Sequence, residues 1–347
     1  MEYYGINNKE NSEHISDRTE EELIVEHKRL KNIKISGHKV EERIMKHNEH
    51  NKKNTEYTMG NLKEEFIVEH NESNNKKNSE YTSEHIKEEF IMEKIITGKN
   101  ITKTFGRGEE KAGALNGVDI EINKGEFVAV MGPSGSGKST LLFALSGTDD
   151  VTGGTVRLCD KELSGLEENE LADIRRTKIG FVFQQPTMLK NLNLLDNIIL
   201  PAVSGSRKDI KHIRRKAETL MERTGISGLE NRDITEVSGG QLQRAGICRA
   251  LINDPEIVFA DEPTGALNSK AADEIMALLE DINKDGTAIL LVTHDAKVAA
   301  RADRVLFTKD GLVVSELSFP EADTETDERD REARTETIIR KMGTIGI

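Results

Sequence analysis

A glycine-rich stretch at residues 130–140, VMGPSGSGKST, places the strongest constraint on how this chain can fold. The pattern GxxxxGK[ST] runs from Gly132 to Ser139 between two apolar runs. We expect a strand at 127–131 and a helix beginning at 139–145, because glycine lets backbone N–H groups curl around phosphates between two such elements. A Gly/Ser loop can also be an ordinary turn, but its placement favours phosphate binding. The predicted binding residues are Gly132, Pro133, Ser134, Gly135, Ser136, Gly137, Lys138, Ser139 and Thr140.

A pair of carboxylates follows a second predicted strand. In IVFADEP (257–263), four apolar residues predict a buried parallel strand, and Asp261 and Glu262 stand at its carboxyl end, where ligands bind in open α/β sheets. Adjacent buried carboxylates are unfavourable unless a cation compensates them. Beside the loop, Lys138 is predicted to pair with the phosphates of ATP. Ser139 and Asp261 would hold Mg²⁺, and Glu262 would polarise the attacking water.

A third motif, VSGGQLQR (237–244), predicts a second anion-binding end. Its Ser238, Gly239, Gly240 and Gln241 stand at the start of a helical pattern that continues through Leu251. The backbone N–H groups and the positive end of that helix therefore face whatever lies ahead of it. The two phosphate-binding ends are about a hundred residues apart in the chain. This separation is explained if two copies face each other head to tail.

With these motifs in this order, residues 95–315 resemble the nucleotide-binding subunit of ATP-binding cassette (ABC) transporters. The resemblance implies an α/β fold of the P-loop NTPase class. Such a domain has a RecA-like core, an antiparallel β subdomain and an α-helical subdomain, here at about residues 186–250. It also implies that the chain uses ATP and Mg²⁺ as cofactors.

The same resemblance assigns roles to further residues. Phe105 in ITKTF would stack on adenine, and Gln184 in FVFQQ would link Mg²⁺ to the helical subdomain. His294 in LVTHD would contact the γ-phosphate, so the implied catalytic residues are Glu262, His294 and Gln184. Asn268 in PTGALNSK departs from the family pattern, which usually has Asp at the end of this interface loop. Asn keeps the hydrogen-bonding geometry and loses the charge, which puts the coupling of the two sites in doubt.

Partners follow from the resemblance as well. In this family, residues 238–241 of one protomer complete the ATP site of the other, which implies a homodimer in the ATP-bound state. The stretches GEFVAVMGPSGSGKSTLLFALSG, KIGFVFQQPTMLKNLNLLDNIILP and ADEPTGALNSK resemble the branch for macrolide export, lipoprotein release and bacitracin-type antimicrobial-peptide resistance. The expected function is an ATPase subunit that drives a separately encoded integral-membrane permease, for export of or resistance to antimicrobial peptides or similar amphiphiles. We expect it at the cytoplasmic face of the cell membrane, held there through the permease.

Two other functions stay open at this point. A regulatory ATPase of the cell-division type would transmit a signal through a permease-like partner without transport. A soluble ABC protein that acts on ribosomes or DNA is disfavoured by the single cassette and by the net charge of −13. We expect no nucleic-acid partner, because a general nucleic-acid binder shows a basic face. No apolar stretch approaches the ~20 residues that span a bilayer.

The first 94 residues differ from the rest of the chain in their repetitive sequence. NKKNTEYTMGNLKEEFIVEH (51–70) and NKKNSEYTSEHIKEEFIMEK (75–94) are near-repeats. Repeats can mark a solenoid, but each copy has one short apolar cluster, so we expect a mostly disordered or short-helical extension at 1–94. Because Met92 opens the stretch with βα signals, we raise the hypothesis that translation can start there.

The cassette is expected at 95–317, and the remaining residues, 318–347, begin with an acidic run, EADTETDERDREA. A charge run is usually solvated, so we expect an acidic tail with a possible short helix near its end. Cys159 and Cys248 are too few for a disulfide framework, and both stand in segments typical of a globular interior. The sequence therefore predicts one large folded domain with two reduced thiols.

Overall fold

The computed structural model describes residues 93–106, 112–203, 209–319 and 328–347. Our expectations for the repeats within 1–92, and the hypothesis about Met92, lie outside the described residues. The described residues belong to one compact unit, Ile91–Ile347, and its first strand begins at Lys94.

Six strands form the central sheet, in the order β10-β9-β3-β8-β7-β6. They are β3 (Phe127–Met131), β6 (Ile179–Phe183), β7 (Ile257–Asp261), β8 (Ala288–Val292), β9 (Arg304–Lys309) and β10 (Leu312–Ser318). β10 runs antiparallel to β9, and the other neighbouring strands run parallel. β3 and β8 are buried along their whole length, because a parallel sheet is covered on both faces. The strands predicted at 127–131 and 257–260 are confirmed.

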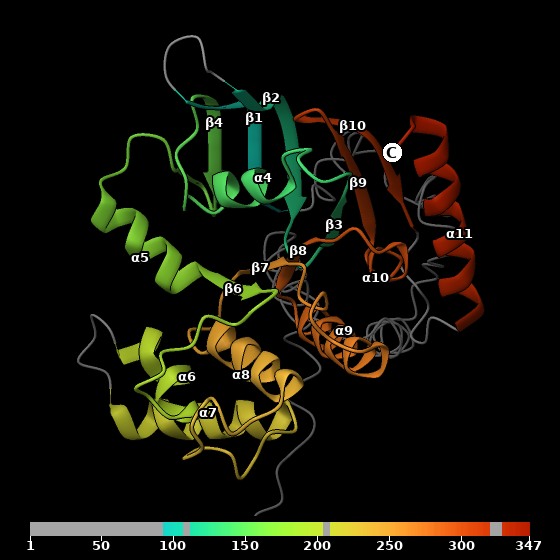
Figure 1. Ribbon diagram of the computed structural model, residues 1–347. Coiled ribbons are helices and arrows are strands. Elements are labelled where there is room, and N and C mark those ends of the chain that lie inside the picture. Colours follow the sequence, from blue (N-terminus) through green and yellow to red (C-terminus); the bar gives the residue numbers. More distant parts are fainter. Residues whose placement is uncertain (1–92, 107–111, 204–208, 320–327) are drawn as a thin grey trace, which may run out of the picture. The chain divides into compact units, whose positions relative to one another are not determined.

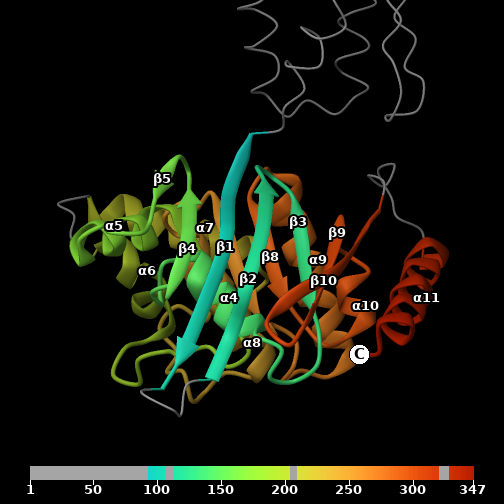
Figure 2. The ribbon, with the colours of Figure 1, turned by 90° about the horizontal axis from the view of Figure 1, so that it is seen from above.

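A second, antiparallel sheet covers the helix that follows the phosphate loop (Figure 2). Its order is β2-β1-β4-β5, with β1 (Lys94–Phe105), β2 (Ala112–Asn123), β4 (Gly153–Leu158) and β5 (Lys161–Glu162). The helix α4 (Lys138–Leu145) packs between the two sheets, because its Leu141 shares one core with Ile96 of β1 and Leu290 of β8. The antiparallel subdomain and the predicted helix are therefore both present.

Three helices form a separate cluster beside the central sheet (Figure 1). They are α6 (Leu194–Val203), α7 (Ile210–Arg223) and α8 (Gly239–Leu251), and α5 (Glu168–Lys178) leads into β6. Ile198, Met221 and Cys248 lie in the small core of this cluster. α8 also contributes Ile247 to the core on one face of the central sheet. The α-helical subdomain implied by the resemblance is present, and α8 joins it to the sheet.

The face of the central sheet that receives Ile247 also carries α9 (Ser269–Lys284) and α10 (Ala296–Ala299), opposite the face that packs against α4. Successive residues of β3 point to opposite faces, so Val128 packs on the side of α4 and Phe127 on the side of α9. The two layers of helices and the sheet between them hold the strand ends of the candidate site in fixed positions.

The C-terminal segment differs from the sequence expectation. The described part of the acidic run belongs to an 18-residue helix, α11 (Glu328–Ile345), which is longer than the short helix expected. Ile338 of this helix is fully buried in the core shared with β9. Arginines within the run pair with acidic groups, as Arg331 does with Glu280 of α9 at 3.3 Å, so the charges do not simply repel. None of the helices in the described ranges combines the length and hydropathy that a membrane span requires.

Candidate nucleotide-binding site

The phosphate loop joins β3 to α4 at the carboxyl edge of the central sheet. Gly135 and Gly137 have φ angles of 80° and 94°, a left-handed region that other residues rarely adopt. A Cβ at Gly137 would lie 2.4 Å from the carbonyl oxygen of Ala114 in β2, so only glycine fits there. α4 begins directly after this glycine, at Lys138. The loop therefore ends at a helix N-terminus, where backbone N–H groups and the helix dipole favour an anion.

The lysine of the motif lies within the loop. Lys138 is only 9% exposed, and its Nζ donates to the carbonyl oxygens of Gly132 at 2.9 Å and Pro133 at 2.8 Å. Burial lowers the pKa of Lys138, while the nearby carboxylates of Glu262 and Asp261 oppose that shift. A partly desolvated cation whose hydrogen bonds within the described residues go to two backbone carbonyls would gain from a phosphate close by.

Asp261 and Ser139 meet at the metal position predicted from the sequence. The hydroxyl of Ser139 donates to Oδ1 of Asp261 at 3.2 Å. Burial raises the pKa of Asp261, the hydrogen bond from Ser139 lowers it, and the charge of Glu262 raises it. A half-buried carboxylate beside a hydroxyl supplies the oxygen ligands that Mg²⁺ prefers, and a cation would relieve the cost of burial. These two residues therefore fit a magnesium ion.

Glu262 and His294 come from neighbouring strand ends and face each other. Glu262 follows β7, His294 follows β8, and Oε1 of Glu262 lies 3.2 Å from Nδ1 of His294. The backbone of Glu262 has a positive φ of 46°, an unfavourable conformation for a residue with a side chain. Its N–H donates to the carbonyl oxygen of Val292 at 2.9 Å, which helps hold this conformation. Such strained residues cluster at active sites.

Gln184 lies just beyond the end of β6, the strand beside the one that leads to the carboxylates. It directly follows Phe183, and Phe183 pairs with Asp261 across β6 and β7. A Cβ at Gly265 would lie 2.7 Å from Nε2 of Gln184, so the glutamine packs against the loop that follows Glu262. The structure thus brings Gln184 next to the predicted metal and hydrolytic residues.

Phe105 stands at the far end of β1, and 48% of the residue is exposed. Nζ of Lys103 lies 5.1 Å from the ring centroid, and the same Nζ pairs with Asp149 at 2.6 Å. An exposed aromatic ring beside a cation can stack on a base. This arrangement is compatible with the adenine contact that the resemblance implies.

The glycine motif 238–241 caps α8. The Oγ of Ser238 accepts from the N–H of Gln241 at 3.3 Å, and Oε1 of Gln241 accepts from the N–H of Ser238 at 2.8 Å. This reciprocal capping box explains why Ser and Gln stand three residues apart. A Cβ at Gly240 would lie 3.8 Å from Cβ of Ala271, so the first turns of α8 and α9 are neighbours, while Gly239 approaches the loop before α9.

Asn268 is the N-cap of α9. Its Oδ1 accepts from the backbone N–H of Ala271 at 2.9 Å. Asn and Asp are about equally good at this position, so the change from the family pattern keeps the cap and removes a negative charge. Among the described contacts, no hydrogen bond or ion pair joins residues 238–241 to residues 132–140. Within the described residues, no such contact therefore joins the two predicted anion-binding ends.

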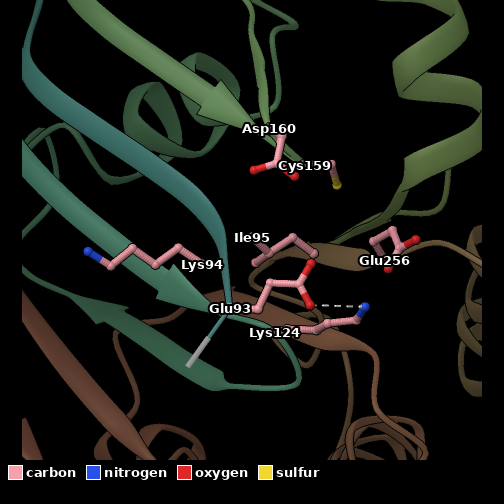
Figure 3. Close-up of a pocket in the computed structure, with 7 residues that line it drawn as sticks. All are labelled: Glu93, Lys94, Ile95, Lys124, Cys159, Asp160 and Glu256. Carbon is pink, nitrogen blue, oxygen red and sulfur yellow. Dashed lines mark ion pairs between the residues drawn. The ribbon is translucent and has the colours of Figure 1, made fainter. Parts of the chain in front are cut away.

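A surface depression lies at the opposite edge of the central sheet (Figure 3). It is lined by Glu93, Lys94, Ile95, Lys124, Cys159, Asp160 and Glu256. Glu256 directly precedes β7, whereas Asp261 ends it, so this depression faces the amino ends of the parallel strands. Burial, with help from Glu256, raises the pKa of Cys159 to about 11, which makes its thiol a poor nucleophile. Open α/β sheets bind ligands at the other edge.

The structure adds one residue that sequence reasoning missed. Thr308 of β9 places its hydroxyl 2.8 Å from the hydroxyl of Ser136, although the two residues are 172 positions apart. No local pattern marks Thr308, because it stands in an ordinary apolar strand. Only the pairing of β9 with β3 brings it to the phosphate loop.

Comparison with known proteins agrees with this geometry. The ABC transporter family model matches residues 115–265. A macrolide export ATP-binding/permease protein of Chlorobaculum tepidum is 45% identical over 224 residues, which are 64% of this chain and 34% of that protein. A bacitracin export ATP-binding protein of Halalkalibacterium halodurans is 38% identical over 253 residues, which are 73% of this chain and 97% of that protein.

Solved structures are similar as well. A dimeric ATP-binding cassette in a post-hydrolysis state, bound to ADP and phosphate, is 41% identical. The match has a TM-score of 0.61 and covers 65% of this chain and 100% of the solved one. This chain spans about a third of the length of the macrolide export relatives that it matches. Since the bacitracin export relative is covered almost completely, and the phosphate loop, carboxylate pair and capped glycine motif all stand on the expected elements, the chain belongs to the ABC transporter family of ATP-binding proteins.

Proposed function

We propose that this protein binds and hydrolyses ATP and that it drives a separately encoded membrane permease. The transported compounds would be antimicrobial peptides or similar amphiphiles, which the permease exports or to which it confers resistance. The observation that carries the ATPase part is one grouping at the carboxyl ends of the parallel strands of the central sheet: Lys138, Ser139, Asp261, Glu262 and His294. Relatives named for macrolide and bacitracin export support the transport part.

ATP binding would begin with the phosphate loop and Phe105. The backbone N–H groups of 132–140 would surround the phosphates, and Lys138 would exchange its two carbonyl acceptors for phosphate oxygens. Phe105, which is half exposed, would support the adenine ring. This exchange is favourable because a phosphate anion compensates the buried ammonium better than neutral carbonyls do.

Magnesium would be held by Ser139 and Asp261, with Gln184 beside them. When bound, Mg²⁺ would offset negative charge on the β- and γ-phosphates. Ser139 would then release its hydrogen bond to Asp261 and turn its hydroxyl oxygen toward the ion. Asp261 would ionise more readily, since a nearby cation stabilises the carboxylate.

Hydrolysis would depend on Glu262 and His294. Glu262 would accept a hydrogen bond from the attacking water, orient it and take up its proton. His294 would donate its Nδ1–H to Glu262, which keeps the carboxylate in place. A contact between Nε2 and a γ-phosphate oxygen would require a second hydrogen on the ring, because phosphate oxygens only accept hydrogen bonds. Nδ1 would be the donor in this pair, because a carboxylate that acts as a base accepts hydrogen bonds.

A second copy would complete each site. Within the described contacts, no hydrogen bond or ion pair joins the phosphate loop to the glycine motif of the same chain, Ser238, Gly239, Gly240 and Gln241. A similar solved cassette is dimeric. The helix N-terminus of α8 would therefore approach the γ-phosphate held by the partner chain. Asn268, at the start of the neighbouring helix, would lie at that interface. Loss of the γ-phosphate would then loosen the dimer.

The permease partner is proposed from the lengths of the relatives. The macrolide export relatives are named as ATP-binding/permease proteins and are covered over about a third of their length. The bacitracin export relative is named as an ATP-binding protein and is covered over 97%. This chain thus matches the ATP-binding part, which would act at the cytoplasmic face of the cell membrane through its permease.

Affinity purification tests the whole proposal. Tagged Glu262→Gln chain, expressed in the native cell, would be purified from solubilised membranes with ATP and Mg²⁺, and co-purifying proteins identified by mass spectrometry. Lys138→Ala, which should not bind ATP, is the matched control. A multi-span permease with a large extracellular domain that is enriched only with Glu262→Gln supports the proposal. A small-domain permease with cell-wall enzymes, or ribosomes without a membrane protein, would contradict it.

A further inference from the structure

The strand β9 packs against the phosphate loop. Thr308, the second-last residue of β9, donates its hydroxyl hydrogen to the carbonyl oxygen of Met131 at 3.1 Å. The hydroxyl of Ser136 lies 2.8 Å from the hydroxyl of Thr308. A threonine hydroxyl has one hydrogen, and Met131 takes it, so Ser136 is the donor in the pair. The two side chains are buried, with only 2% and 3% of Thr308 and Ser136 exposed.

These hydrogen bonds tie both ends of the loop to one side chain. Met131 is the last residue of β3, and Ser136 stands just before the glycine that caps α4. The carbonyl oxygen of Ser136 also accepts from the N–H of Gly311 at 3.2 Å, in the turn that follows β9. A Cβ at Gly132 would lie only 2.3 Å from the carbonyl oxygen of Thr308. The first glycine of the loop therefore packs directly on β9.

The end of β9 and the residue that follows it are held by hydrogen bonds from two sides. Nζ of Lys309 donates to the carbonyl oxygens of Ile345 at 3.1 Å and Gly346 at 3.2 Å, at the end of α11. On the other side, Nδ2 of Asn116 in β2 donates to the carbonyl oxygen of Asp310 at 2.7 Å. Because these contacts come from the C-terminal helix and the antiparallel sheet, the segment behind the loop is held from outside the loop.

We propose that Thr308 is a positioning residue that keeps the phosphate loop in its ATP-binding shape. The inference rests on the proposed ATP binding. A loop with glycines at 132, 135 and 137 has many accessible backbone conformations, and ordering it costs binding free energy. The buried hydroxyl pair reduces this cost, because the loop is already ordered before ATP arrives. The contacts of Thr308 are with the loop, so any effect on ATP would act through the loop.

Calorimetric titration of the full chain with ATP and Mg²⁺ tests the inference. Thr308→Val keeps the shape of the side chain and removes the hydroxyl, whereas Thr308→Ser keeps the hydroxyl. We expect Thr308→Val to raise the Kd for ATP about tenfold, equivalent to about 1.4 kcal/mol, and Thr308→Ser to stay near the wild-type Kd. Ser136→Ala should weaken binding in the wild-type background and have little further effect in Thr308→Val, because both changes remove the same hydrogen bond.

Two further measurements separate positioning from a general loss of stability. Thermal unfolding without nucleotide reports on the fold, and amide hydrogen exchange of residues 132–137 reports on the loop in the absence of ATP. We expect faster exchange of this segment in Thr308→Val. An unchanged Kd and unchanged exchange with a lower melting temperature would overturn the inference, as would a Thr308→Ser chain as weak as Thr308→Val. Thr308→Ala replaces Thr308→Val if that variant does not fold.

The proposed function can fail separately from the inference. A wild-type chain that binds no more ATP than Lys138→Ala contradicts the proposed ATP site itself. In that case, faster exchange of the loop amides in Thr308→Val would still show that β9 and the loop are linked. The absence of ATP binding by the wild-type chain would nevertheless overturn the role of Thr308 in ATP binding. If the wild-type chain binds ATP, the tenfold difference in Kd between Thr308→Val and the wild type decides the inference.

Discussion

Substitution of Gly135 and of Gly137 in the phosphate loop distinguishes the cost of backbone strain from the cost of steric overlap. Both have left-handed φ angles, 80° at Gly135 and 94° at Gly137, where an alanine costs about 1–2 kcal/mol. Only Gly137 also lacks room. Its Cβ would lie 2.4 Å from the carbonyl oxygen of Ala114, whereas no heavy atom lies within 4 Å of a Cβ at Gly135. Ala114 belongs to β2, at a point where the register with β1 shifts, so relief of this contact would require movement of the strand backbone itself rather than of a flexible side chain.

We expect Gly135→Ala to lower the free energy of unfolding by about 1 kcal/mol, because the reduced entropy of the unfolded chain offsets part of the strain. Gly137→Ala should lose about 2–4 kcal/mol, since an overpacking cost of about 1–3 kcal/mol adds to the same strain. Urea denaturation of the full chain without nucleotide measures both losses, provided that the m-value is unchanged. Equal losses in the two variants would refute the steric argument, because strain alone would then explain both.

Four other substitutions test separate features. Glu262→Gln should bind ATP, stop turnover and elute as a dimer in ATP and Mg²⁺ on size-exclusion chromatography; a monomer at saturating ATP would count against the head-to-tail arrangement. Asn268→Asp should leave the Kd for ATP nearly unchanged in calorimetry, because Asp caps α9 as well as Asn does, and lost binding would show a different role. Burial raises the pKa of Asp261, so the folded state binds this proton more tightly than the unfolded state, and stability falls as pH rises through the folded-state pKa. Asp261→Asn should therefore raise the melting temperature without nucleotide at neutral pH and lose that advantage in acid; an advantage that persists in acid would contradict this cause. Ile338→Ala should lower the free energy of unfolding by about 2–5 kcal/mol in urea, because Ile338 is fully buried, and an unchanged value would mean that α11 is not docked in solution.

Much of the fold could be predicted because its signals are local. The run at 127–131 is apolar throughout and precedes the glycine loop, which predicted β3 and the helix after it. The same reasoning predicted β7 and the start of α8, where Ser238 and Gln241 form the capping box. The C-terminal helix was only partly anticipated. Its acidic run reads as solvated in the sequence, and the burial of Ile338 becomes visible only when α11 packs against the core.

The phosphate loop, the carboxylate pair and the capped glycine motif could be placed in order on strands and helices from the sequence, because each depends on residues within a few positions of one another. Which of these motifs meet depends on how the strands pair in space. The strand order puts β7 and β8 side by side, so Glu262 reaches His294. It also puts β9 beside β3, so Thr308 reaches Ser136 across 172 positions. Hydrophobic periodicity shows that a strand is buried but not which strand is its neighbour, and the contacts that shape this site depend on that neighbour.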